Sequence, residues 1–310
     1  MKLSLVIPVY NEAENLPLLV PAVDAALASL KDVELEFVFV DDGSQDETLA
    51  RLRTLAETDR RVRAVSFSRN FGSHAALRAG FQHCTGDVVA FIAADLQDPP
   101  ELLVRLLEKW REGNQVVWGS REKRDDPFFT TLFSKVYSSL MRRLALREMP
   151  ASGVDVCLAD RQVIDAVLAM AEKNTSVMGL IMWAGFRQTF VPYDRAARRH
   201  GHSKWTLAKK LKLFVDSFVS FSFFPIRLVS YLGLTVSALG FAYAMFIIAR
   251  RLVVGTPMQG WPSLMVAVVT LSGLQLLMLG IVAEYLWRAF DEARKRPPYI
   301  IRETVGFGNK

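Results

Sequence analysis

The first two hundred residues alternate short apolar runs with stretches of helical periodicity. The apolar runs that predict strands are 3–9, 36–40, 62–66, 88–93 and 116–119. The apolar positions that recur at helical spacing between them are Leu16, Leu19, Val20, Val23, Leu27, Leu49, Leu52 and Leu55. Strands that alternate with helices are typical of a parallel sheet covered by helices on both faces. The pattern therefore predicts a doubly wound, Rossmann-like α/β domain over residues 1–200.

Two long apolar stretches follow this domain. Residues 228–249 and 263–283 contain 22 and 21 consecutive residues without a charge. A helix of the first length spans about 33 Å against roughly 30 Å of bilayer hydrocarbon, so we predict two transmembrane helices within 227–288. The basic residues that flank the pair are Arg195, Arg198, Arg199, Lys204, Lys209, Lys210, Lys212, Arg227, Arg288, Arg294, Lys295 and Arg296. By the positive-inside rule, we expect a multi-pass protein of the inner membrane with both termini and the α/β domain in the cytoplasm.

Two amphipathic stretches predict helices at the membrane surface. Residues 128–147 place aromatic and aliphatic side chains on one helical face and basic side chains off it, and residues 201–226 form a second such segment before the first span. Packing on the α/β domain is the alternative for these helices. Residues 289–310 are then expected to be a cytoplasmic C-terminal tail.

Composition and charge limit the class of protein. With 51% hydrophobic and 23% charged residues the chain is too apolar to be disordered, and its net charge of +6 is modest. Cys84 and Cys157 are too few for a disulfide framework, and no Cys/His cluster indicates zinc. The start of the chain shows no secretory signal. We therefore expect a reducing environment, and no nucleic-acid partner.

Polar segments follow the first two predicted strands, where ligands bind in doubly wound folds. Pro8, Tyr10 and Glu12 lie in the first segment, and Asp41 and Asp42 open the second. Neither segment is a Gly-rich phosphate-binding loop. A carboxylate at a strand end accepts hydrogen bonds from a base or a ribose, and the alternative is an ordinary turn and helix cap. The sequence leaves both interpretations open.

The fourth predicted strand leads into Asp95, Gln97 and Asp98. Asp95 and Gln97 are two residues apart, so they project to one side if the chain is extended there. Two oxygen ligands of this kind, with substrate phosphates and water, suit Mg²⁺ or Mn²⁺. Asp98 precedes two prolines and has the simpler interpretation of a helix cap.

Seven stretches in a fixed order make the chain resemble family 2 glycosyltransferases of the inverting GT-A fold, and more narrowly the polyprenyl-phosphate glycosyltransferases. They are Val6-Ile-Pro-Val-Tyr-Asn-Glu12, Val40-Asp-Asp-Gly-Ser44, Ser68-Arg-Asn-Phe-Gly72, Asp95-Leu-Gln-Asp-Pro-Pro-Glu101, Gly119-Ser-Arg121, Gly201-His-Ser-Lys204 and Phe221-Ser-Phe-Phe-Pro-Ile-Arg227. The resemblance includes bactoprenol glucosyltransferases, aminoarabinose-type transferases and, more distantly, dolichyl-phosphate mannose synthase. It covers nearly the whole chain.

The resemblance implies a role for each matched residue. The pocket for the nucleoside of a nucleotide-sugar donor would be lined by Pro8, Tyr10, Glu12, Asp41 and Asp42. The metal would be held by Asp95 and Gln97. Arg121, Arg198 and Lys204 match basic residues that meet the donor or lipid phosphates. Asp155 falls near the Asp of a Gly-Asp pair in the acceptor site of relatives, although here Val154 separates it from Gly153.

One departure from the family pattern bears on activity. Relatives carry Asp-x-Asp where this chain has Ala93-Ala94-Asp95, so one negative charge is absent from the metal site. Weaker metal binding is one consequence, and loss of catalysis is another. The alternative function is therefore a catalytically impaired, glycosyltransferase-like membrane scaffold.

A polyprenyl phosphate acceptor suits the charge pattern. A phosphomonoester is already largely anionic at pH 7 and needs no strong base, whereas two anionic substrates need cations between them. We expect transfer to undecaprenyl phosphate, with a UDP-linked donor favoured over GDP, in the modification of lipopolysaccharide or another cell-envelope glycan. The resemblance also implies a homo-oligomer, a tetramer in some relatives, at the lipid bilayer.

Overall fold

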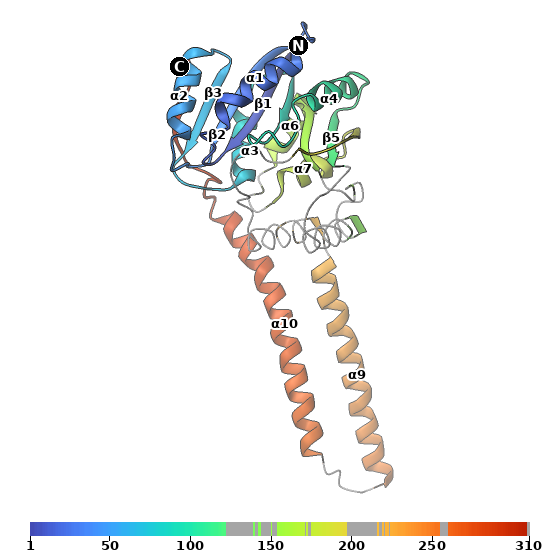
Figure 1. Cartoon of the computed structure of the whole chain (residues 1–310). Helices are drawn as coiled ribbons and strands as arrows, with labels where there is room; N and C mark the ends of the chain where they lie inside the picture. The colour runs from blue at the N-terminus through green and yellow to red at the C-terminus, as the bar shows by residue number, and fades with distance from the viewer. Residues whose placement is uncertain are drawn as a thin grey trace. The chain divides into compact units, whose positions relative to one another are not determined.

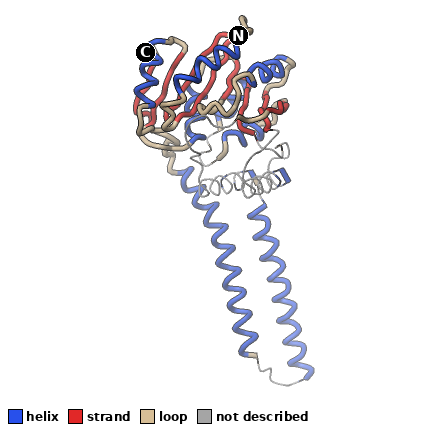
Figure 2. The backbone as a smooth tube through the Cα atoms, in the orientation of Figure 1, coloured by secondary structure: helices blue, strands red, loops and turns tan. Residues whose placement is uncertain are grey.

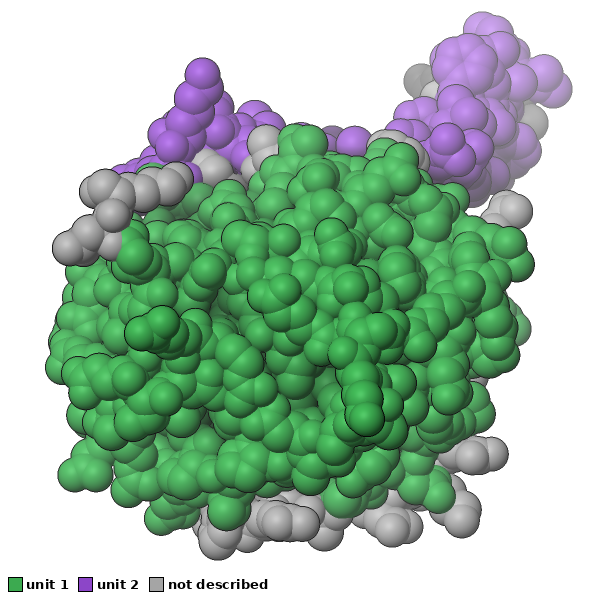
Figure 3. Space-filling view, turned by 90° about the horizontal axis from the view of Figure 1, so that it is seen from above, with its two compact units in different colours: residues 1–218, 297–310 green, residues 219–296 purple. Residues whose placement is uncertain are grey.

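The computed structural model describes residues 1–121, 154–170, 175–196, 224–254 and 260–308, together with single positions between these ranges. The chain divides into two compact units, which Figure 3 distinguishes by colour. Residues 1–218 and 297–310 form the first unit, and residues 219–296 form the second.

The first unit is built on one mixed sheet with the strand order β7-β5-β6-β4-β1-β2-β3-β8. Its strands are β1 (Lys2–Val9), β2 (Glu34–Asp41), β3 (Val62–Phe67), β4 (Val88–Phe91), β5 (Val116–Arg121), β6 (Val154–Asp160), β7 (Gln188–Tyr193) and β8 (Ile301–Val305). The antiparallel strands β6 and β8 are exceptions in an otherwise parallel sheet. Figures 1 and 2 show helices on both faces of the sheet. The predicted doubly wound α/β fold is thus confirmed.

The helices that the structure describes are α1 (Leu16–Leu27), α2 (Thr48–Thr58), α3 (Ser73–His83), α4 (Leu102–Arg111), α6 (Arg161–Ala169), α7 (Val177–Trp183), α9 (Phe224–Val254) and α10 (Trp261–Ala293). All five predicted strands and both helices predicted between them are present, with ends that differ by a few residues. The sequence interpretation nominated none of β6, β7 and β8. In particular, β8 lies within 289–310, which was expected to be only a tail.

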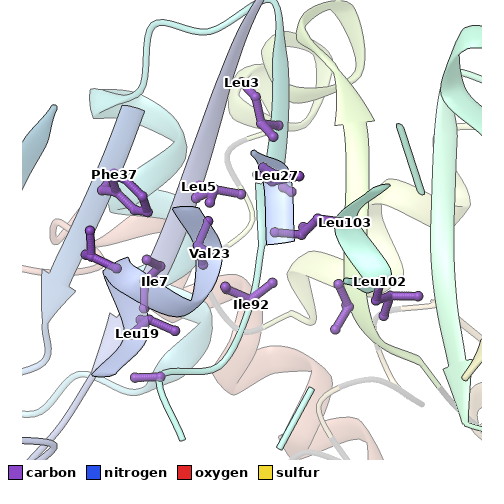
Figure 4. Packing of buried hydrophobic residues seen from close by; sticks show 14 of the residues in the cluster. Leu3, Leu5, Ile7, Leu19, Val23, Leu27, Phe37, Ile92, Leu102 and Leu103 are labelled. Atoms are coloured by element: carbon purple, nitrogen blue, oxygen red, sulfur yellow. The ribbon is translucent and has the colours of Figure 1, made fainter. Parts of the chain in front are cut away.

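The alternation of side chains along β1 separates the two layers of helices. Leu3, Leu5 and Ile7 are fully buried beneath α1, whose Leu19, Val23 and Leu27 point toward them in Figure 4. Val6 points to the opposite face, where a Cβ built at Gly80 of α3 would lie 2.2 Å from Val6 Cγ1. Only glycine permits that approach of α3 to the sheet. The core therefore holds the sheet rigid beneath the loops at its edges.

The second unit contains α9 and α10. Ile226–Arg250 and Leu264–Ala293, of 25 and 30 residues, are long and apolar enough to cross a membrane, and the apolar windows of both are exposed in the structure. Exposed large apolar side chains include Leu234, Phe241 and Leu276. These properties agree with the two spans predicted at 228–249 and 263–283, by length and composition.

Candidate functional site

The candidate residues of the first unit meet at one edge of the sheet. Because β1, β2, β4, β5 and β7 run parallel, the segments that follow them leave the sheet at the same edge. The antiparallel strand β6 begins at that edge and carries Asp155 as its second residue. β1 lies between β2 and β4, which is the switch point where such folds bind ligands.

Reciprocal hydrogen bonds join the loops after β1 and β2. The Asn11 backbone N–H donates to Ser44 Oγ at 2.9 Å, and the Gln45 N–H donates to Asn11 Oδ1 at 2.8 Å. Asn11 has a φ of 51°, a left-handed conformation that asparagine tolerates better than most residues. Glu12 N–H donates to Thr48 Oγ1 at 2.9 Å. The backbone of the segment that carries Tyr10 and Glu12 is thereby fixed against the second loop.

The carboxylates of Asp41 and Asp42 are both buried and both accept hydrogen bonds from the protein. Asp41 accepts from the Ser44 N–H at 2.9 Å and from Ser66 Oγ at 2.7 Å. Asp42 accepts from the backbone N–H groups of Phe71 and Gly72, at 2.6 and 2.9 Å. The turn that the sequence offered as the alternative is therefore present, and the nucleoside role of these residues stays a prediction.

The Asp95 segment turns instead of extending. Leu96 has a φ of 54°, and the Gln97 N–H donates to Asp95 Oδ1 at 3.2 Å. The expectation of an extended chain is wrong, because this local turn replaces the alternation of a strand. Asp95 is only 5% exposed. In the part of the chain that the structure describes, no three His, Cys, Asp or Glu side chains gather around one point.

Asp98 binds the end of β7 and does not cap α4. Tyr193 Oη donates to Asp98 Oδ1 at 2.6 Å, and Arg195 Nε lies 3.3 Å from the same oxygen. Neighbouring hydrogen bonds tie Ala196 to Gln97, with the Ala196 N–H donating to the Gln97 carbonyl at 2.9 Å. The interpretation of Asp98 as a helix cap is wrong. Sequence reasoning missed Tyr193 because β7 was not nominated as a strand.

Burial and charge shift the ionisation of this cluster. Burial raises the pKa of Asp98, against the lowering effects of Arg195 and of the hydrogen bond from Tyr193. Burial, together with the carboxylates of Asp98 and Asp155, raises the pKa of the Tyr193 phenol. A second buried oxygen, Asp98 Oδ2, has no hydrogen-bond partner among the residues that the structure describes.

Arg121 pairs with Asp155 beside this cluster. Arg121 ends β5 in register with Tyr193 of β7, and its Nε contacts Asp155 Oδ2. Burial lowers the pKa of Arg121, but the Asp155 carboxylate and other nearby negative groups outweigh it, so the pKa is raised overall. The Arg121 guanidinium is thus a permanent positive charge at the edge of the sheet where the candidate residues meet. Asp155 and Arg121 were both sequence-predicted, and the structure brings them together.

Two predicted site residues, Arg198 and Lys204, lie outside the described residues, as do most positions of the predicted helices at 128–147 and 201–226. Pro8 and Tyr10 are partly exposed at the same edge as Asp42.

Comparison with known proteins identifies the family of this chain. The profile of glycosyl transferase family 2 matches residues 4–168. The chain belongs to this family. The match includes the sheet from β1 to β6 and hence most of the candidate site. Because the family consists of glycosyltransferases, the chain is an enzyme of that type.

Relatives within the glycosyltransferases match almost the whole chain. It is 39% identical to an uncharacterised glycosyltransferase of Synechocystis sp. over 99% of this chain and 96% of that protein. It is 37% identical to the bactoprenol glucosyl transferase of Shigella phage SfII, over 98% of both chains. Among solved structures, it is similar to glucosyl-3-phosphoglycerate synthase from Mycobacterium tuberculosis in complex with Mn²⁺, UDP-glucose and phosphoglyceric acid. That match has a TM-score of 0.46 and 21% identity and covers 70% of this chain and 79% of that one.

Proposed function

We propose that this glycosyltransferase moves a sugar from a nucleoside diphosphate donor, UDP-linked in preference to GDP-linked, to a polyprenyl phosphate. The observation that carries the proposal is the Arg121–Asp155 pair beside the Asp95 turn, in a chain that resembles a bactoprenol glucosyl transferase from end to end. The partly buried guanidinium suits a reaction between two anionic substrates, since it offsets negative charge in a region of reduced solvent.

The reaction would proceed by direct displacement. An oxygen of the acceptor phosphate attacks the anomeric carbon, and the bond from that carbon to the donor β-phosphate oxygen breaks on the opposite face, so the configuration inverts. The acceptor enters as an anion and requires no strong base. Arg121 would stabilise the departing diphosphate, Arg198 and Lys204 would orient the acceptor, and Asp155 would shape the acceptor site through its pairing with Arg121.

A divalent cation, Mg²⁺ or Mn²⁺, fits the residues at the Asp95 turn. Asp95 and Gln97 offer the oxygen ligands that such ions prefer, and two protein ligands suffice where substrate phosphates and water complete the shell. The ion would supply charge compensation to the donor diphosphate.

The apolar helices support work at a membrane. With α9 and α10 as spans and the basic flanks on one side, the catalytic unit would lie on the cytoplasmic face. A lipid-linked acceptor phosphate is presented at that surface. We also propose that several copies of the chain associate, as the resemblance to polyprenyl-phosphate glycosyltransferases implies.

The test is an assay of the full chain in detergent with undecaprenyl phosphate, Mn²⁺ and a panel of UDP- and GDP-sugars, with mass detection of the lipid product. We expect a lipid-linked sugar from at least one donor. Donor binding without turnover across the panel would instead support the scaffold alternative that Ala93 raised, and no binding at all would contradict the proposal.

A further inference from the structure

The segment that follows the two apolar helices returns to the catalytic sheet. β8 pairs antiparallel with β3, in a register that sets Val305 opposite Ala64 and Ile301 opposite Phe67. The Ser68 N–H extends the ladder by donating to the Ile300 carbonyl at 3.0 Å. Figure 1 shows the C-terminus beside α2 and β3. This segment therefore holds the last residues of β3 and the start of the loop after it.

Aromatic rings continue this contact into the loop. The Tyr299 ring stacks on Phe67 with centroids 4.8 Å apart, and Phe67 meets Phe71 edge to face at 5.7 Å. The Tyr299 hydroxyl donates to Gln82 of α3. Such ring pairs favour one geometry over others, since their energy depends on orientation. A chain of contacts thus runs from Tyr299 to Phe71.

The far side of the same loop contacts the two candidate nucleoside carboxylates. Ser66 and the backbone N–H groups of Phe71 and Gly72 are the donors that hold Asp41 and Asp42. The approach is close, because a Cβ at Gly43 would lie 2.5 Å from the Arg69 carbonyl carbon. A displacement of the loop over residues 66–72 would therefore reach Asp42 directly.

We propose that Tyr299 is a positioning residue of the donor site: its ring, through Phe67 and Phe71, fixes the N–H groups that orient the Asp42 carboxylate toward a nucleoside diphosphate. The inference rests on the proposed function, since it takes Asp42 as a nucleoside ligand. The donor site is then assembled from β1 and β2 at one end of the sequence and from the segment after the apolar helices at the other.

The experiment measures the binding of UDP and of GDP to the full chain in detergent. Tyr299→Ala should weaken the binding of the preferred nucleotide by at least about five-fold, the equivalent of one lost ring contact. Tyr299→Phe keeps the stacked ring and should retain most of the affinity. Phe307→Ala is the matched control, because Phe307 belongs to the same segment and borders the same buried cluster as Tyr299, but its ring pairs with Arg63 and His83 rather than with Phe67.

The outcomes separate the two proposals. If neither nucleotide binds the wild-type chain, the proposed function fails. If Tyr299→Ala binds as tightly as wild type, or if Phe307→Ala weakens binding equally, the segment is merely structural and the inference is overturned. Should Tyr299→Ala not fold, Tyr299→Leu replaces it, with hydrogen exchange over residues 66–72 as the second measurement. Faster exchange there without a change over residues 188–193 supports the inference, and unchanged exchange contradicts it.

Discussion

Two sides of the same sheet edge are held together by different kinds of interaction. The Asp41 side, defined as residues 8–12, 41–46 and 66–72, relies on backbone N–H groups and hydroxyls that donate to carboxylates at 2.6–2.9 Å. The Arg121 side, defined as residues 95–98, 119–121, 154–155 and 193–196, relies on charged side chains, with the pairs Arg121–Asp155 and Arg195–Asp98. On this second side, each carboxylate pairs with a partly buried arginine.

This difference suits the two sides to different substrates. Neutral donors fix a carboxylate in one orientation, which suits the recognition of a nucleoside by hydrogen bonds. Buried ion pairs carry a desolvation cost, and an anionic ligand that shares the guanidinium recovers part of it. Substitutions on the Asp41 side should therefore act on donor binding, whereas substitutions on the Arg121 side should act on turnover.

Arg121→Ala should have the largest effect. Removal of a preorganised cation from the departing charge should lower kcat by about 10²–10³-fold, by analogy with the loss of one donor from an oxyanion site. UDP binding should change much less, because the Asp41 side is intact. Initial rates at saturating donor and acceptor measure kcat, and a separate titration measures UDP affinity.

The control for this substitution is Arg105→Ala, which removes an exposed arginine of α4 outside both sides. It should leave kcat close to wild type, since surface substitutions away from a site usually have little effect. An unchanged kcat in Arg121→Ala would refute the division of roles between the two sides.

His74 of α3 contacts the start of α7, outside both sides, and should make the stability of the fold depend on pH. Its Nδ1 accepts the Val177 N–H at 3.3 Å, and burial lowers its pKa to about 4 from an ordinary value of 6.5. A depressed folded-state pKa means that stability is complete above pH 6.5 and is lost as the pH falls toward 4. The ceiling of this loss is about 3 kcal/mol, and partial solvent access to the ring keeps the effect below it.

Thermal unfolding of the full chain in detergent, at pH 7.5 and at pH 5, measures this dependence. His74→Gln should reduce the difference between the two melting temperatures, because glutamine does not titrate. His83→Gln is the control in the same helix, and it should leave the difference in place. An equal pH dependence in wild type and His74→Gln would show that other groups cause it.

Tyr193→Phe should have an intermediate effect, confined to the Arg121 side. It removes the hydrogen bond to Asp98 and leaves that buried carboxylate oxygen with Arg195 alone beside it among the described residues, at a cost of about 1–3 kcal/mol of stability. A double-mutant cycle with Asp98→Asn, measured by denaturant unfolding, isolates the pair. A coupling energy near zero would show that the contact does not stabilise the fold.

The sequence was informative where local patterns determine the structure. Apolar periodicity identified β1 and α1, and the motif that ends β5 singled out Arg121, which lies beside Asp155 in the structure. Local patterns did not predict the elements that depend on long-range pairing. The strand β8 is a short run that contains Arg302 and Glu303, and its pairing with β3 makes it a strand. The partnership of Asp98 with Tyr193 likewise joins residues far apart in the chain, which no local spacing reveals.

Ala93→Asp should give the smallest effect, and it tests the candidate metal ligands of the Arg121 side. Ala93 is partly exposed at the end of β4, so an aspartate fits without burying a charge. Because affinity for a hard divalent cation rises with the number of carboxylate ligands, the Mn²⁺ concentration for half-maximal activity should fall on the order of ten-fold. Ala93→Asn supplies an oxygen of similar reach without the charge and should produce a smaller shift. Equal Mn²⁺ requirements in all three proteins would mean that the residue at position 93 does not face the ion, and that Asp95 and Gln97 bind it without help from the end of β4.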